Sequence, residues 1–143
     1  MTGMDLQSVA DKIEIHELLA RYARGVDTHD WEVWKSVFTE DAVIDYSLSG
    51  AAKGSREEVA AFLAESFATI PWATHHITNF EVELDGDSAK VRAMFFNPMQ
   101  LPGVDGESAT GGFYEHDMVR TSEGWRSRHL VEHPMWFVNP PTP

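Results

Sequence analysis

Apolar residues recur at three- and four-residue spacing in the first part of the chain, the pattern of an amphipathic helix. The apolar stripe consists of Leu6, Val9, Ile13, Ile15, Leu18, Leu19, Tyr22 and Val26. This spacing predicts one long helix that ends near Asp27–His29.

Two shorter helices are expected after it. Asp30 has the side chain of an N-cap, and the apolar positions that follow predict a short helix over residues 31–38. Ser55 and Glu58 have the three-residue spacing of a capping box, which predicts a third helix with an apolar face over residues 59–67.

The second half of the chain alternates between apolar and polar residues, the period of β-strands. Phe80, Val82 and Leu84 share one face of such a strand. Long strands are expected over residues 74–84, 89–97, 110–121 and 125–137, after a shorter one over 42–48. Helices followed by a run of long strands indicate one α+β domain over residues 1–143, with three N-terminal helices on a curved, mostly antiparallel sheet.

Charge and composition narrow the range of functions. The chain has 11 basic and 23 acidic residues and a formal net charge of −12, so nucleic acid and anionic membranes are unfavourable partners. It has no cysteine, which excludes disulfides, thiolate catalysis and thiolate zinc sites. No apolar run is long enough for a membrane helix and the first residues do not form a secretory signal, so a cytoplasmic location is expected.

One histidine and one carboxylate are candidates for chemistry. Side chains alternate faces along a strand, and His76 stands an even number of positions before Phe80, so the two are expected to share the inward face. His75 should face outward or into a loop. Asp27 stands at the C-terminal end of the long helix, where the helix dipole and burial would both raise its pKa towards that of a useful base. The alternatives are a core histidine bonded to a backbone carbonyl and an aspartate that caps a turn.

Tyr22 and Tyr46 are further candidates, because a buried tyrosine hydroxyl needs a hydrogen-bonding partner. Each of them could equally be a core residue. The histidines lack the spacing of a metal-hydrolase motif, and the chain has no phosphate-binding glycine loop, so neither a metal nor another cofactor is expected. Part of a methionine and aromatic set is expected to line an apolar cavity, and the candidates for substrate contact are His116, Tyr114, Phe96, Met94 and Trp72.

Residues 10–133 resemble the SnoaL-like (nuclear transport factor 2-like) superfamily. The similarity rests on a helix that ends in Tyr-x-x-x-x-Asp at Tyr22 and Asp27, on a Trp-containing short helix, and on the Phe-Thr-Glu-Asp-Ala turn that begins at Phe38. A later hairpin with Gly-Trp at its turn, residues 111–129, continues the resemblance. The resemblance implies a cone-shaped α+β barrel.

The enzymes of this superfamily that the chain resembles are scytalone dehydratase, bile acid 7α-dehydratase and hexachlorocyclohexane dehydrochlorinase. The resemblance implies a cofactor-free lyase in which an Asp–His pair falls on Asp27 and His76, with tyrosines at Tyr22 and Tyr46. A second pocket histidine of the family falls near Gly111–Gly112 and is absent here, as is an arginine that falls near Leu130. His116 is the candidate replacement.

Three functions remain open on the sequence. The first is dehydratase-type elimination from a mostly apolar cyclic small molecule, and the second is isomerisation or polyketide-type cyclisation on the same scaffold. The third is ligand binding without catalysis. The apolar segment 134–138, which precedes a Pro-rich tail, predicts either a lid over the pocket or the interface of a homodimer or homotrimer.

Overall fold

The computed structural model describes residues 5–141. Within this range the helices are α1 (Leu6–Asp27), α2 (Trp31–Lys35) and α3 (Arg56–Phe67), with a 3₁₀ turn, η1 (Ser47–Ser49). The strands are β1 (Phe38–Asp45), β2 (Lys53–Ser55), β3 (Trp72–Ala73), β4 (His76–Asp85), β5 (Ser88–Gln100), β6 (Ser108–Thr121) and β7 (Gly124–Val138). The three predicted helices and five predicted strands are present, but α2 ends at Lys35, β1 begins and ends earlier than expected, and β5 ends later. The short strands β2 and β3 were not predicted.

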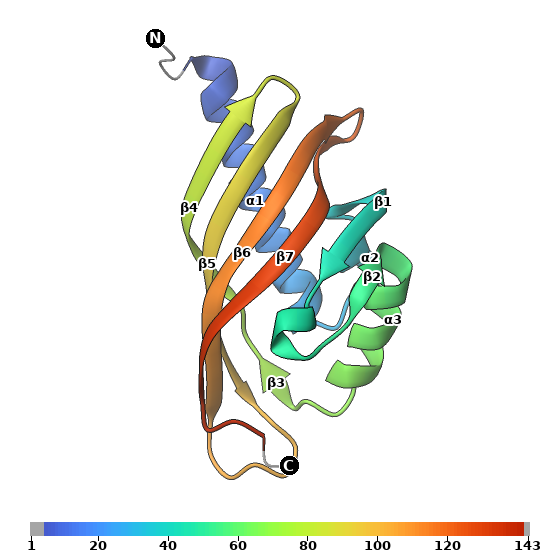
Figure 1. Ribbon diagram of the computed structural model, residues 1–143, viewed down its shortest axis with the longest axis vertical. Coiled ribbons are helices and arrows are strands. Elements are labelled where there is room, and N and C mark those ends of the chain that lie inside the picture. Colours follow the sequence, from blue (N-terminus) through green and yellow to red (C-terminus); the bar gives the residue numbers. More distant parts are fainter. Residues whose placement is uncertain (1–4, 142–143) are drawn as a thin grey trace.

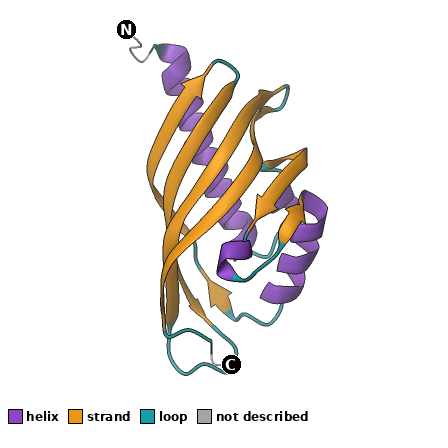
Figure 2. Ribbon diagram, viewed as in Figure 1, coloured by secondary structure: helices purple, strands orange, loops and turns teal. Residues whose placement is uncertain are grey.

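The strands form one sheet in the order β2-β1-β7-β6-β5-β3, and β4 also pairs with β5. β1 is parallel to β7, and the other neighbours are antiparallel. α1 lies behind the four long strands, while α2 and α3 lie beside β1 and β2 (Figure 1). Figure 2 shows the long strands curving around the helices. The predicted α+β class, with helices on one face of a curved, mostly antiparallel sheet, is confirmed.

The predicted apolar stripe of α1 is correct only in part. From Ile15 onward its residues are buried, but Leu6 is 88% exposed and Ile13 is 56% exposed. Leu6 and Ile13 lie about half a turn around the helix from Ile15, so they point away from the sheet. The buried residue of this part of the helix is Asp11, which is only 5% exposed.

Asp11 fastens α1 to the last hairpin. The Arg120 guanidinium donates hydrogen bonds to its two carboxylate oxygens at 2.7 and 3.0 Å, and Trp125 Nε1 donates a third at 3.1 Å. The Arg120 hydrogen bonds, followed by that of Trp125, hold the pKa of Asp11 at about 2 despite its burial. A buried carboxylate needs such partners, so this contact sets the position of α1 across the sheet.

The glycine pair at Gly111–Gly112 marks a close approach of β6 and β7. The pairing shifts register between the two glycines. A Cβ atom on Gly112 would lie 2.1 Å from the carbonyl oxygen of His133, and one on Gly111 would overlap the Trp136 ring. Side chains at these positions would force the strands apart, so the bend of the sheet here requires glycine.

The chain ends complete the description. Residues 139–141 are irregular, while residues 1–4 and 142–143 lie outside the described residues. Among the described helices, none has the length and apolar character needed to cross a membrane.

Candidate functional site

A mostly apolar cavity of about 640 Å³ lies between the inner face of the sheet and the end of α1, η1 and α3. Its polar lining residues include Tyr22, Tyr46, His75, Asn97, Tyr114 and Glu132. Its apolar lining includes Val26, Leu63, Phe67, Phe95, Met99 and Met135. A roomy apolar pocket with a few converging polar groups is the usual form of a small-molecule site.

Asp27 pairs with a histidine at this pocket, and the histidine is His75. His75 Nδ1 lies 2.6 Å from Asp27 Oδ1, and the backbone N–H of His75 donates to Asp27 Oδ2 at 2.9 Å. The side chains are 7% exposed for His75 and 22% exposed for Asp27. A carboxylate on Nδ1 fixes the tautomer of the ring and leaves Nε2 as the nitrogen that can take up a proton.

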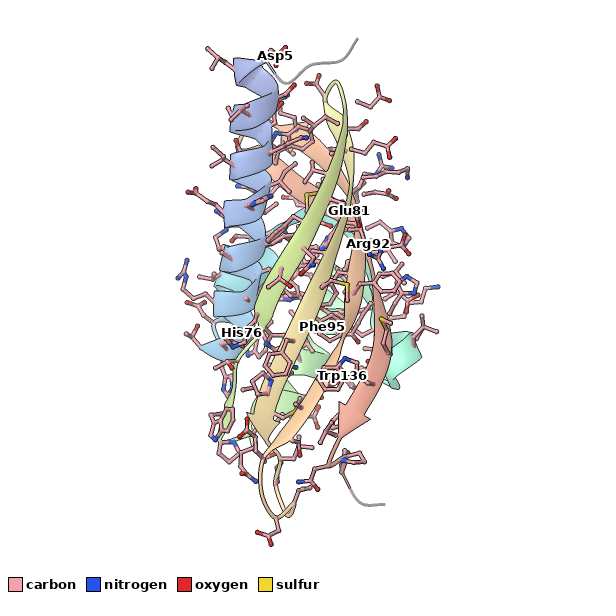
Figure 3. All side chains as sticks on the ribbon, turned by 90° about the vertical axis from the view of Figure 1, so that its left-hand side faces the viewer. Asp5, His76, Glu81, Arg92, Phe95 and Trp136 are labelled. Atoms are coloured by element: carbon pink, nitrogen blue, oxygen red, sulfur yellow. The ribbon has the colours of Figure 1, made fainter. Side chains whose placement is uncertain are left out.

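The expected pairing of Asp27 with His76 is wrong. His76 is exposed, and it stands opposite Phe96 on the outer face of the sheet with 5.9 Å between the ring centroids. Figure 3 labels His76 where β4 begins, beside the end of α1. His75 lies in the loop before β4, but its ring turns inward to Asp27 and the cavity, so the expectation that it faces outward or into a loop is wrong as well.

The cause is a β-bulge in β4. Thr78 pairs with Met94 and Glu81 pairs with Arg92, so three steps along β4 match two along β5. Asn79 within this irregularity has φ of +53°, the left-handed conformation that asparagine tolerates better than most residues. The extra residue reverses the alternation of faces, so Phe80 faces inward while His76, on the other side of the bulge, faces outward.

Three tyrosines form the polar floor of the pocket. The hydroxyls of Tyr22 and Tyr46 lie 2.5 Å apart, and the ring of Tyr114 meets the ring of Tyr22 edge-on at 5.5 Å. Burial raises the pKa of each hydroxyl well above its ordinary value. The tyrosines therefore stay protonated and can donate hydrogen bonds to an oxygen of a bound molecule.

Two polar residues of the pocket were not among the sequence candidates. Glu132, on β7, stands directly opposite Tyr114 in the pairing of β6 with β7. Asn97 is 8% exposed, and its Oδ1 has no hydrogen-bonding partner among residues 5–141. The strand parity of Glu132 with the apolar Leu130 was the sequence signal for a carboxylate that faces inward.

Burial raises the pKa of Glu132. A hydrogen bond from Ser49 and the nearby His75 act in the opposite direction and are weaker. A carboxyl group in such a place holds its proton to higher pH than an exposed glutamate does.

The remaining candidates for substrate contact divide into two groups. Tyr114 lines the cavity as expected, but Trp72, Met94 and Phe96 do not. Trp72 and Phe96 are instead exposed, because Phe96 has the outward parity of β5 and Trp72 lies on the short edge strand β3.

His116 also lies outside the cavity lining, so it does not replace the missing pocket residues. It is 2% exposed, and its Nδ1 shares a hydrogen bond of 2.8 Å with Ser127 Oγ. Burial lowers the pKa of His116 to about 3, so the ring is neutral at physiological pH. Its position is that of a core histidine between the sheet and α1.

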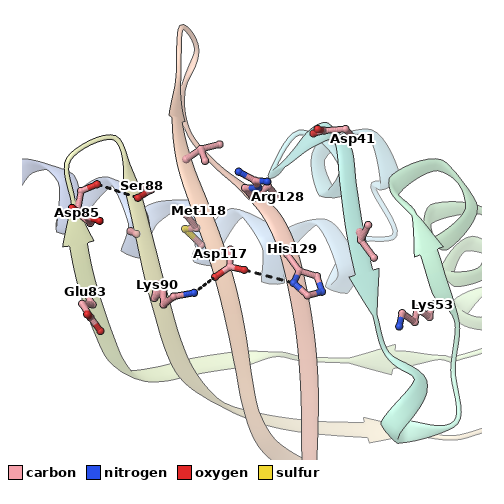
Figure 4. Close-up of a pocket in the computed structure, with 13 residues that line it drawn as sticks. Asp41, Lys53, Glu83, Asp85, Ser88, Lys90, Asp117, Met118, Arg128 and His129 are labelled. Atoms are coloured by element: carbon pink, nitrogen blue, oxygen red, sulfur yellow. Dashed lines mark hydrogen bonds and ion pairs between the residues drawn. The ribbon is translucent and has the colours of Figure 1, made fainter.

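A second hollow, on the outer face of the sheet, is charged. Figure 4 shows Lys90, Asp117 and His129 on adjacent strands with α1 behind them. Lys90 Nζ lies 2.8 Å from Asp117 Oδ1, and His129 Nδ1 lies 3.7 Å from Asp117 Oδ2. The charges of Lys90 and Asp117 neutralise each other. In residues 5–141, no three His, Asp or Glu side chains are grouped as metal ligands.

Comparison with known proteins adds the family context. A model of the SnoaL-like domain matches residues 7–131. The uncharacterized protein Rv2910c of Mycobacterium tuberculosis is 34% identical over 130 residues, which cover 90% of this chain and 88% of that protein.

Two solved structures share the fold. The Kfla4162 protein from Kribbella flavida is 30% identical with a TM-score of 0.83, over 92% of this chain and 95% of that one. Hexachlorocyclohexane dehydrochlorinase LinA-type3 from Novosphingobium barchaimii has a TM-score of 0.82 over 94% of this chain and 93% of that one. Its identity is 19%, so that similarity concerns the fold.

Proposed function

The chain belongs to the SnoaL-like family, and from this premise we propose that it is a cofactor-independent lyase. Its reaction would be the elimination of water from a mostly apolar, cyclic small molecule. The observation that carries the proposal is the hydrogen-bonded Asp27–His75 pair at the wall of an apolar cavity. The fold shared with a dehydrochlorinase, an enzyme of elimination, agrees with it.

In this reaction His75 is the general base. Asp27 holds its Nδ1, so Nε2 removes a proton from a carbon next to a carbonyl group. The electron pair of that C–H bond moves towards the carbonyl oxygen and forms an enolate. Of the paired hydroxyls of Tyr22 and Tyr46, one donates to the other, and the one that accepts donates its own proton in a hydrogen bond to the enolate oxygen. The enolate then expels the hydroxyl group on the adjacent carbon.

Two other reactions use the same pocket and give different products. An isomerase or polyketide-type cyclase would move a proton with the same pair, and nothing would leave the substrate. A binding protein without catalysis would accept the same apolar molecules and leave them unchanged. Product mass separates the three, because only elimination lowers it by one water molecule.

The two adjacent histidines provide the test. With 3-hydroxycyclohexanone as probe, the enzyme should form cyclohexenone, and in D₂O it should exchange the proton next to the carbonyl. His75→Gln and Asp27→Asn should each lower the rate by ~10² or more, the usual contribution of general-base catalysis. His76→Gln is the matched control and should keep the wild-type rate, since His76 is exposed on the outer face. Equal rates in His75→Gln and the wild type would refute the proposal.

A further inference from the structure

The elimination described above needs a second proton-transfer group. Hydroxide is a poor leaving group, so the departing oxygen must receive a proton as its bond to carbon breaks. The tyrosines already stabilise the enolate oxygen by hydrogen bonding, and His75 gains a proton in the reaction, so neither can protonate the departing oxygen. A group that holds a proton and reaches the same cavity from another element is required.

Glu132 occupies such a position. It lies on β7, whereas His75 precedes β4 at the far edge of the sheet, and both side chains line the same cavity. Its cross-strand neighbour is Tyr114, which is 1% exposed and faces the cavity with it. Residues directly opposite on paired strands have their Cβ atoms about 5 Å apart, so Glu132 adjoins the tyrosine floor.

We propose that Glu132 is the general acid that protonates the departing oxygen. This inference rests on the proposed function, because it assigns the second proton of the same elimination. It goes beyond that function by stating what the substrate must carry: a hydroxyl group whose loss requires acid assistance.

His75 and Glu132 together account for both protons that the elimination transfers. His75 takes the proton from carbon, and the electrons of the C–H bond become the new carbon–carbon double bond. The C–O bond breaks with its electron pair on oxygen, and the Glu132 carboxyl supplies the proton that completes a water molecule. The enzyme is left with protonated His75 and ionised Glu132, so exchange of one proton with solvent at each group restores the starting state.

The surroundings of Glu132 suit a carboxyl group that starts protonated. The groups facing it are the hydroxyls of Tyr22, Tyr46 and Tyr114, with Ser49 beside it. Within residues 5–141, His75 is the nearby group whose positive charge favours the ionised form of Glu132. Protonation of His75 during turnover therefore lowers the pKa of Glu132 at the moment when its proton is needed.

The first experiment measures Glu132 without a substrate. Protein labelled with ¹³C at the glutamate side-chain carboxyl is titrated by NMR, and Glu132→Gln identifies the Glu132 signal. We expect a midpoint above that of Glu58, whose pKa is lowered by hydrogen bonds from the backbone and side chain of Ser55. His75→Gln should raise the Glu132 midpoint further, and His76→Gln should leave it unchanged. A Glu132 midpoint at or below that of Glu58 would overturn the proposal.

The second experiment varies the leaving group. 3-Hydroxycyclohexanone needs a proton on its departing oxygen, whereas 3-(4-nitrophenoxy)cyclohexanone releases 4-nitrophenolate as a stable anion. Glu132→Gln should lower kcat/KM by ~10² for the hydroxyl compound and by only a few-fold for the nitrophenoxy compound. Thermal unfolding of the variant checks that it folds.

The outcomes separate this inference from the function on which it rests. His75→Gln should slow both compounds, and if it slows neither, the proposed lyase function fails. If His75→Gln slows both but Glu132→Gln slows both equally, Glu132 has only a structural role and the present proposal fails. Rescue by the better leaving group is the result that a structural role does not produce.

Discussion

His116 should make the stability of this protein strongly dependent on pH. The ring is buried between the sheet and α1, and its Nε2 has no hydrogen-bonding partner among the described residues. Burial lowers its pKa from 6.5 to about 3, so the folded protein keeps the ring neutral. The unfolded chain exposes the ring to water and binds a proton near pH 6.5.

The size of the effect follows from this difference. Above pH 6.5 both states are neutral at His116, and the residue contributes no pH dependence. Below pH 6.5 only the unfolded state gains the proton, so the free energy of unfolding falls by about 1.4 kcal/mol for each pH unit. The loss is about 3 kcal/mol at pH 4.5, and it approaches about 5 kcal/mol when the folded ring begins to titrate near pH 3.

Urea unfolding at pH 7.5 and pH 4.5, followed by the fluorescence of the buried Trp34 and Trp125, measures this loss. His116→Gln removes the titrating ring, so its difference in unfolding free energy between the two pH values should be about 3 kcal/mol smaller than that of the wild type. His76→Gln, the same change at an exposed histidine, should keep the wild-type difference. A wild-type difference in His116→Gln would mean that the folded protein accepts a proton at His116, which would refute the reasoning.

Three further predictions concern other parts of the structure. Asp11→Asn should lower the free energy of unfolding by about 3 kcal/mol at pH 7, because Arg120 loses a buried carboxylate. Since the folded-state pKa of Asp11 is about 2 and its ordinary value is 3.8, this contribution is present above pH 4 and is lost towards pH 2, as acid titration of both proteins would check. Asn79→Val should cost about 1–2 kcal/mol in urea unfolding because φ is +53°, whereas Asn79→Gly should be nearly neutral. The exposed apolar segment 134–138 leads us to expect a homodimer or homotrimer that strengthens with salt, since the net charge of −12 is then screened; sedimentation as a monomer at every concentration and salt level would contradict it.

Local signals in the sequence were sufficient for most of the fold. Asp30 accepts a hydrogen bond from the backbone N–H of Val33, and Ser55 and Glu58 form the complete capping box that their spacing predicts. Such contacts lie within one turn of helix, so they do not depend on the rest of the chain. The exposure of Leu6 and Ile13 was missed because the apolar stripe combined residues from two faces of α1, and only the face that carries Asp11 and Ile15 packs on the sheet.

The candidate site was predictable to a smaller extent. Tyr22, Asp27 and Tyr46 lie at the cavity or beside it, as expected. We assigned the inward face of β4 by counting alternate residues back from Phe80, and this count gave His76 instead of His75. A single extra residue at a bulge reverses the faces of all residues beyond it, so the count fails there. Glu132 was missed because a carboxylate on a strand is usually solvated, so its shared strand face with the apolar Leu130 was not followed; the structure places it opposite Tyr114.

Asp27 explains why His75, and not His76, faces α1. Its carboxylate accepts both the ring Nδ1–H and the backbone N–H of His75, so it fixes the main chain as well as the side chain at this point. With the main chain held there, a regular strand would turn Phe80 outward, away from the core that it contacts. The bulge around Asn79 removes this conflict, because it lets both His75 and Phe80 face inward. The irregularity of β4 is therefore the structural condition for an Asp–His pair at the pocket, and Asn79 is the residue whose conformation permits it.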